Sequence, residues 1–233
     1  MGISLAMGTG GGEGAAYAGF LYALHQFEIP VSGICACGTS VFPCLAKDPG
    51  HLYFLVHIWK HLCTSGFITD QEAVYEALAL LFPALRLENH PARLAVVACD
   101  VLTGQPVLIR EGSAAAVAAS SLWSANGPCI RTVDRRHLSD GSVFGVPVNS
   151  AARLFGRPVV ALRAARPSKP RVGVSEILIQ AAAHRLDDAA ELVIDIGLGE
   201  GQEDDVNTWF SAGRRQACLW QETLSFMAKE QGT

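Results

Sequence analysis

Charged residues are scarce in this chain of 233 residues: they make up 17% of it, and the formal net charge is −4. Such a chain has no general electrostatic attraction to nucleic acid, so no nucleic-acid partner is expected. No uncharged apolar run is long enough to cross a bilayer. The N-terminus lacks the basic segment ahead of an apolar one that marks a secretory signal. These absences argue against a nucleic-acid-binding protein and against an integral membrane protein.

Paired cysteine motifs are also absent. The seven cysteines, at positions 35, 37, 44, 63, 99, 129 and 218, include no CxxC pair. The chain therefore gives only weak support to a zinc ribbon or a thioredoxin-type redox site. The odd number of cysteines and their apolar surroundings predict free thiols in a reducing compartment. We therefore expect a cytoplasmic protein.

Hydrophobic residues, by contrast, make up half of the chain. At this length they predict one domain with a large core over residues 1–233. The apolar run Ile3–Met7 predicts a strand, Ala15–Phe27 an amphipathic helix and Val31–Cys37 a second strand, a unit typical of parallel sheets. Further strands are expected at Ala95–Cys99, Val107–Ile109, Cys129–Val133, Val159–Leu162 and Leu192–Ile196. Helices are expected across Pro43–Phe82, where Thr69–Glu72 forms a capping box, and at Ser113–Trp123, Pro147–Leu154, Ser175–Leu186 and Thr208–Lys229.

Two segments in the first fifty residues carry the chemistry. The glycine-rich turn Thr9–Gly14 follows the first strand, and a turn at a helix start offers free backbone N–H groups to an anion. Ser40 follows the second strand, where a tight strand-to-helix turn exposes a serine hydroxyl. Acyl transfer through serine needs these two parts, an oxyanion hole and a nucleophile. A dinucleotide site is disfavoured, because Gly8–Glu13 lacks the last glycine of that fingerprint and no acidic residue ends the second strand.

A histidine base for Ser40 is not evident. Only His184 has the chain order of an α/β-hydrolase triad, and its surroundings predict the middle of a helix. Asp140 is the better candidate, because an Asp-Gly turn after a short strand can aim a carboxylate across the sheet. The alternatives are structural: Ser40 as a helix N-cap and Asp140 as an ordinary turn residue. Asp100 is expected to cap a turn.

The ordered set of motifs resembles the patatin-like phospholipase and acylhydrolase family. The resemblance rests on the glycine loop, the serine turn, Asp140-Gly141 before Val146-Pro147-Val148, and the segment Ala98–Gly104. It implies a three-layer α/β/α fold with a mainly parallel central sheet, and ester hydrolysis without metal or cofactor. Ser40 then takes the role of nucleophile and Asp140 that of base. Gly10 and Gly11 supply the oxyanion N–H groups, and Gly12 is a further candidate.

The chain departs from the family pattern at three places. Thr9 replaces a glycine of the loop and Glu13 its basic residue, which favours neutral or small acyl esters over anionic phospholipids. Phe42 stands where the family has glycine or alanine. The same acyl-enzyme could serve an acyltransferase, and the departures favour a catalytically silent ligand-binding or partner-binding protein as a further alternative.

The predicted helical segment Pro43–Phe82 contains two further features that could have a function. His57 and His61 are four residues apart, but no glutamate lies between them, so an exposed helix face is expected there rather than a zinc site. Leu52–Trp59 is apolar nearly all round. This predicts a buried helix, with a flap that transiently contacts acyl chains or a membrane surface as the alternative.

Overall fold

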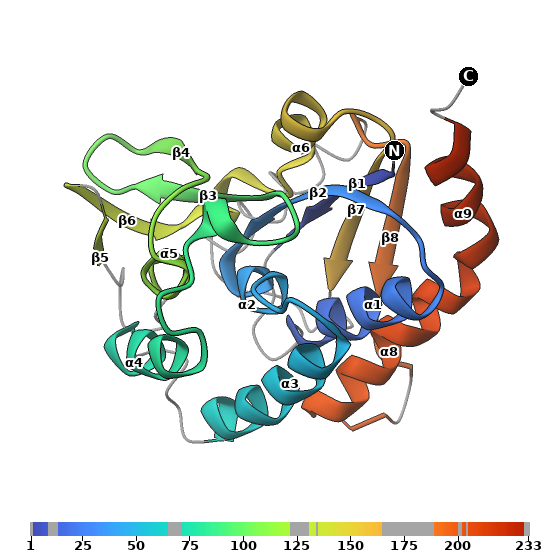
Figure 1. Ribbon diagram of the computed structural model, residues 1–233, viewed down its shortest axis with the longest axis horizontal. Coiled ribbons are helices and arrows are strands. Elements are labelled where there is room, and N and C mark those ends of the chain that lie inside the picture. Colours follow the sequence, from blue (N-terminus) through green and yellow to red (C-terminus); the bar gives the residue numbers. More distant parts are fainter. Residues whose placement is uncertain are drawn as a thin grey trace.

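The computed structural model describes residues 2–8, 14–64, 71–121, 131–133, 135–164, 189–199, 202–203 and 205–230. Within these residues eight strands form one sheet (Figure 1). The strands are β1 Ile3–Met7, β2 Val31–Cys37, β3 Leu94–Asp100, β4 Gln105–Ile109, β5 Arg131–Val133, β6 Arg136–Asp140, β7 Val159–Ala164 and β8 Leu192–Ile196.

The helices connect these strands or follow them. They are α1 Gly14–Gln26, α2 Val41–Cys44, α3 Pro49–Thr64, α4 Gln71–Leu81, α5 Ala114–Ser120, α6 Val148–Phe155, α8 Val206–Leu219 and α9 Gln221–Lys229. Short 3-10 turns occur at η1 Gly38–Ser40, η3 Leu87–Asn89 and η4 Gly141–Phe144. Asp205 caps the N-terminus of α8, because its carboxylate accepts hydrogen bonds from the first backbone N–H groups of that helix.

The middle of the sheet is parallel. β1 lies between β2 and β7, β3 continues the sheet beyond β2, and β8 beyond β7, all in the same direction. β4 and β6 run antiparallel to β3, and β5 antiparallel to β6. The predicted mainly parallel α/β sheet is confirmed, with an antiparallel extension around β3.

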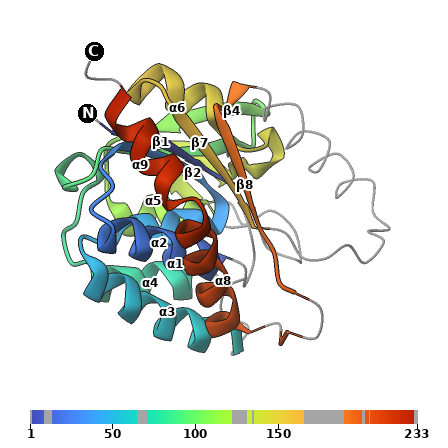
Figure 2. The same ribbon diagram turned by 90° about the vertical axis from the view of Figure 1, so that its right-hand side faces the viewer.

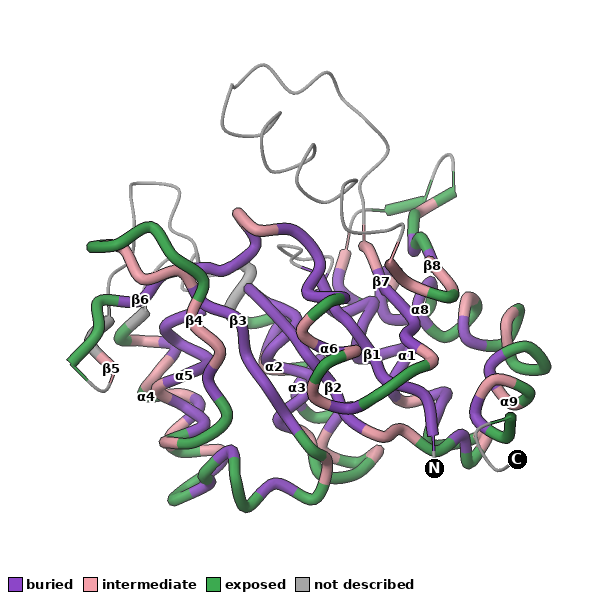
Figure 3. The backbone as a smooth tube through the Cα atoms, turned by 90° about the horizontal axis from the view of Figure 1, so that it is seen from above, coloured by how far each residue is buried: buried purple, intermediate pink, exposed green. Residues whose placement is uncertain are grey.

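Side chains that follow one another along a strand point to opposite faces of the sheet, so the hydrophobic core has two layers. In β2, Ile34 and Ala36 face the layer that holds α1, whereas Cys35 and Cys37 face the layer that holds α6. Figure 2 shows α6 on one side of the sheet and α1, α3 and α8 on the other. Both faces of the central strands are therefore covered, and Figure 3 shows β1 and β2 buried along most of their length.

Several predicted elements have different limits in the structure. The segment expected to be helical from Pro43 to Phe82 contains α2, α3 and α4 as separate helices, and the C-terminal helix is divided at Trp220 into α8 and α9. The structure also contains the strand β6, whose bounds the sequence pattern does not predict. The first half of the capping box, Thr69 and Asp70, and all of Ser175–Leu186 lie outside the described residues.

Helix α3 is amphipathic rather than buried all round. Leu52, Leu55 and Trp59 are buried, but Tyr53 is 57% and Phe54 is 53% exposed. The sequence prediction of a fully buried helix is therefore wrong for the outer face of α3. Among the described residues, no helix is long and apolar enough to cross a membrane.

Candidate active site

Strand β3 brings together the two turns that carry the candidate residues. β4 pairs with the carboxyl half of β3 and occupies one of its edges there, so β2 and β6 share the other edge. Cys37, the last residue of β2, pairs with Val97 of β3. Asp140, the last residue of β6, pairs with the next residue, Ala98. The carboxyl ends of β2 and β6 therefore meet, and the turn that holds Ser40 adjoins the turn after Asp140.

The predicted strand-to-helix turn after β2 is present. Ser40 ends the 3-10 turn η1, which leads directly into helix α2. The turn begins at Gly38, whose φ of 60° lies in the left-handed region that favours glycine. Ser40 itself has right-handed helical angles, φ −65° and ψ −16°. The reversal of the chain is thus accommodated at Gly38, two residues before the candidate nucleophile.

The Ser40 hydroxyl is enclosed by main-chain carbonyls. Ser40 is fully buried, and the single proton of its Oγ has two carbonyl acceptors within reach, those of Cys37 at 2.8 Å and Met7 at 3.1 Å. The expectation of an exposed hydroxyl is therefore wrong in this conformation, because the ends of β1 and β2 surround it. The same contacts fix Ser40 at the carboxyl edge of the two central strands, where α/β proteins commonly place their reactive groups.

Asp140 is also buried, with 3% of its surface exposed. Its Oδ1 accepts a hydrogen bond of 2.8 Å from the Ser142 backbone N–H, which begins η4. The turn lies directly on β3: a Cβ added to Gly141 would lie 2.2 Å from the Val97 carbonyl oxygen. Glycine is thus needed here for close approach, and Asp140 is held at the junction of β2, β3 and β6.

Cys37, which the sequence predicts only as a free thiol at the end of a strand, is a further neighbour of this junction. The single proton of its Sγ has two carbonyl acceptors within reach, those of Met7 at 3.6 Å and Gly145 at 3.7 Å, so Cys37 lies between the end of β1 and the end of η4. Burial raises the pKa of the Cys37 thiol well above its usual value, and the Asp140 charge raises it further. A neutral thiol is a poor nucleophile, so Cys37 is no substitute for Ser40. Its position three residues before Ser40 was the available sequence signal.

The proposed oxyanion residues Gly10, Gly11 and Gly12 lie outside the described residues, as does His184. On one side of the loop, the Gly8 backbone N–H donates to the Leu162 carbonyl at 3.2 Å. On the other side, α1 begins at Gly14. The roles of the three loop glycines therefore stay predictions.

Two other sequence predictions concern residues near or beyond the site. Asp100 caps a turn, as predicted: its Oδ1 accepts from the backbone N–H groups of Leu102 at 3.0 Å and Thr103 at 3.4 Å. His57 and His61 lie on the exposed face of α3, also as predicted, and the His57 ring packs edge-on against Tyr53 at 4.9 Å.

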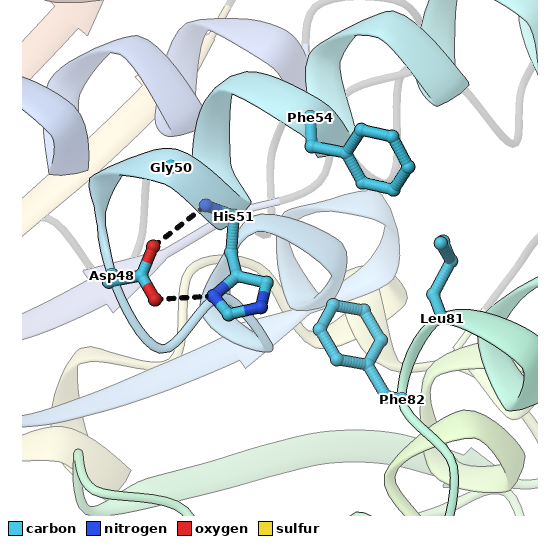
Figure 4. Close-up of a pocket in the computed structure, with 6 residues that line it drawn as sticks. All are labelled: Asp48, Gly50, His51, Phe54, Leu81 and Phe82. Carbon is cyan, nitrogen blue, oxygen red and sulfur yellow. Dashed lines mark hydrogen bonds and ion pairs between the residues drawn. The ribbon is translucent and has the colours of Figure 1, made fainter.

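A groove of about 320 Å³ lies between the start of α3 and the end of α4 (Figure 4). Its polar part is an ion pair in which His51 Nδ1 lies 2.6 Å from Asp48 Oδ2. The hydrogen bond from the His51 backbone N–H lowers the pKa of Asp48. Its apolar walls are Phe54, Leu81 and Phe82. Neither Ser40 nor Asp140 lines the groove, so it is separate from the candidate active site.

Comparison with known proteins points to one family. An uncharacterized NTE family protein of Mycobacterium bovis is 24% identical to this chain over 154 residues, and two NTE family proteins from strains of Mycobacterium tuberculosis match equally well. The chain is thus similar, at low identity, to proteins of the NTE family. The matched part is 61% of this chain and 43% of each relative, so the chain spans less than half of their length. No protein-family model matches the chain.

Solved structures confirm the patatin-like fold. VipD from Legionella pneumophila aligns with a TM-score of 0.55 over 95% of this chain and 67% of its own, at 12% identity. The ExoU-SpcU complex from the type III secretion system of Pseudomonas aeruginosa aligns with a TM-score of 0.51 over 98% of this chain and 52% of the matched chain, at 11% identity. The three-layer α/β architecture expected from the motifs is therefore confirmed.

Proposed function

We propose that this chain is a serine acyl-ester hydrolase, with Ser40 as nucleophile and Asp140 as base. Its substrates are lipids or related acyl esters, preferably neutral or small ones, and residues 1–233 act as one patatin-like acylhydrolase domain. The observation that carries the proposal is the meeting of β2 and β6 on one edge of β3. One of these strands leads into the turn that holds Ser40, and the other ends at Asp140. The two residues are one hundred positions apart in the chain, and the meeting of their strand ends supports their pairing as nucleophile and base.

The reaction begins with the Ser40 proton. The hydroxyl hydrogen points to main-chain carbonyls, so it must turn toward Asp140 before Oγ attacks the ester carbonyl. Oγ forms a bond to the carbonyl carbon as Asp140 takes the proton. The protonated Asp140 then donates it to the departing alcohol, whose bond to carbon breaks. Water, activated by the same carboxylate, releases the acid and restores Ser40.

The oxyanion is stabilised by the glycine loop in this proposal. In many serine hydrolases the backbone N–H after the nucleophile is one of the donors. Here that group, on Val41, is directed to the carbonyls of Gly38 and Thr39 inside the turn. The N–H groups of Gly10 and Gly11, with Gly12 as a further donor, therefore have to supply the stabilisation. Loss of one such donor costs about 10²–10³ in rate.

A specific observation favours a second candidate, a catalytically silent ligand-binding protein. Ser40 is fully buried and its hydroxyl already has two acceptors, as in a purely structural turn. An acyltransferase differs from the hydrolase only in the acceptor of the acyl group, and kinetics distinguish the two.

Hydrolysis of p-nitrophenyl butanoate by purified variants tests the proposal. Ser40→Ala should lower kcat/KM by about 10³-fold or more, and Asp140→Asn by about 10²–10⁴-fold. Two matched controls should retain activity. Ser139→Ala removes a buried hydroxyl that has no hydrogen-bond partner among the described residues, and Asp100→Asn alters a carboxylate that caps a turn.

The kinetics of the wild type separate the candidates. Continuous turnover supports the hydrolase. A burst of one equivalent of p-nitrophenol without turnover identifies an acyltransferase. No release of p-nitrophenol, or equal release by Ser40→Ala, contradicts the proposal and favours the silent protein.

A further inference from the structure

Phe42, two residues after Ser40, places a large aromatic ring beside the serine turn. It is buried, with 2% of its surface exposed. Its ring meets the Trp59 ring edge-on, with centroids 5.0 Å apart and planes at 71°. Such pairs are stabilised by more than the burial of their area. Phe42 therefore fixes the nucleophile helix α2 against α3 and does more than fill space.

Trp59 extends this contact to the far end of the glycine loop. A Cβ added to Gly14 would lie 2.4 Å from Trp59 Cη2 and 3.2 Å from Thr39 Oγ1. The indole thus fills the space beside the first residue of α1 and the residue that precedes Ser40. Within the part of the chain that the structure describes, its buried Nε1–H has no hydrogen-bond partner. Packing, rather than a polar contact, holds the ring in place.

The two rings close an apolar cavity between α2, α3 and α4. The described residues that line it are all apolar or aromatic: Phe42, Leu55, Ile58, Trp59, Val74 and Leu78. About 10 Å³ of space remains in it, which is at the lower limit of what one water molecule requires. Two of the side chains that nearly fill this apolar space therefore lie close to the candidate site: Phe42 follows Ser40 by two residues, and Trp59 packs beside Gly14 at the end of the glycine loop.

We infer that Phe42 and Trp59 plug the acyl-chain compartment of this protein and restrict it to esters with short acyl chains. The inference rests on the proposed hydrolase function and names the substrate class within it. A longer chain needs apolar space next to the serine turn, and the two rings occupy that space. Removal of one large core side chain opens a cavity on the order of 150 Å³, enough for a benzene-sized ligand. A Phe42→Ala change thus makes room for several additional methylene groups.

The test is the ratio of kcat/KM for p-nitrophenyl octanoate to that for p-nitrophenyl butanoate. The wild type should favour butanoate, and Phe42→Ala should raise the ratio at least tenfold. Phe42→Leu, which disturbs the fold less, should raise it by a smaller factor in the same direction. Phe155→Ala is the matched control: Phe155 is buried on the opposite face of the sheet, so its loss should leave the ratio unchanged.

The outcomes separate this inference from the proposed function. If Phe42→Leu and Phe42→Ala are active and their octanoate-to-butanoate ratio of kcat/KM is unchanged, Phe42 does not restrict acyl-chain length. The proposed hydrolase function is not affected by that result. An equal rise in Phe155→Ala also overturns the plug, because the effect would then come from a loosened core. Absence of ester hydrolysis in the folded wild type overturns the hydrolase, and the plug with it.

Discussion

Gly141→Ala is the substitution that most directly probes the placement of Asp140. The new Cβ would lie 2.2 Å from the Val97 carbonyl oxygen, and Cβ atoms in real structures come no closer than about 3.0 Å to such an atom. The turn must therefore move away from β3 by at least 0.8 Å, the difference between these distances. Because Asp140 precedes this residue, its carboxylate moves as well. A displacement of about 1 Å in a catalytic group can lower the rate about 10²-fold.

The assay is the rate of covalent labelling by a fluorophosphonate, measured together with the free energy of unfolding in urea. We expect labelling about 10²-fold slower than in the wild type and a loss of about 1–3 kcal/mol of stability from overpacking. Gly199→Ala is the control, because its Cβ would make only an ordinary contact of 3.5 Å with Gln202. Wild-type labelling by a folded Gly141→Ala protein would refute the argument that the position of Asp140 limits acylation.

Two further predictions concern titratable groups. Burial lowers the pKa of His90, whose ring Nδ1 accepts from the Ala92 backbone N–H at 3.1 Å, below the value of about 6.5 in the unfolded chain. The folded protein then binds fewer protons than the unfolded one. Neutral His90 thus contributes to the free energy of unfolding above about pH 6.5, and this contribution is lost as the pH falls through the lowered pKa. In urea unfolding, the free energy of unfolding of His90→Gln should depend less on pH than that of the wild type. An equal dependence would contradict this prediction. Burial also raises the pKa of Cys35 to about 12 and that of Cys37 well above its usual value, whereas Cys218 is exposed. Iodoacetamide at about pH 8 should therefore modify Cys218 in the native protein and leave Cys35 and Cys37 unmodified, which peptide mass spectrometry can measure. Rapid modification of Cys37 would disprove its burial.

The sequence predicted the central strands well, because local patterns determine them. The apolar runs Ile3–Met7 and Val31–Cys37 coincide with β1 and β2, and the intervening helix gives the expected parallel pairing. The sequence also identified Ser40 and Asp140 as turn residues at strand ends. These features depend on the period of apolar residues and on the residue types that form turns.

What could not be predicted depends on contacts between distant segments. No local pattern shows that β2 and β6 share one edge of β3, since strand register is set by tertiary packing. The same is true of the Ser40 hydroxyl. It is covered by the Met7 carbonyl at the end of β1. Nothing in the sequence around Met7 indicates this contact, because the two residues are far apart in the chain. The contact of Trp59 with Phe42 and Gly14 also joins three separate elements.

The central claim is that Ser40 is a nucleophile served by Asp140. The most direct test is to label the purified protein with a fluorophosphonate and locate the adduct by peptide mass spectrometry. We predict one adduct, on Ser40, that is absent in Ser40→Ala and forms much more slowly in Asp140→Asn. A folded wild type that takes up no label, or one labelled at another residue, would contradict the claim and identify Ser40 as part of a structural turn.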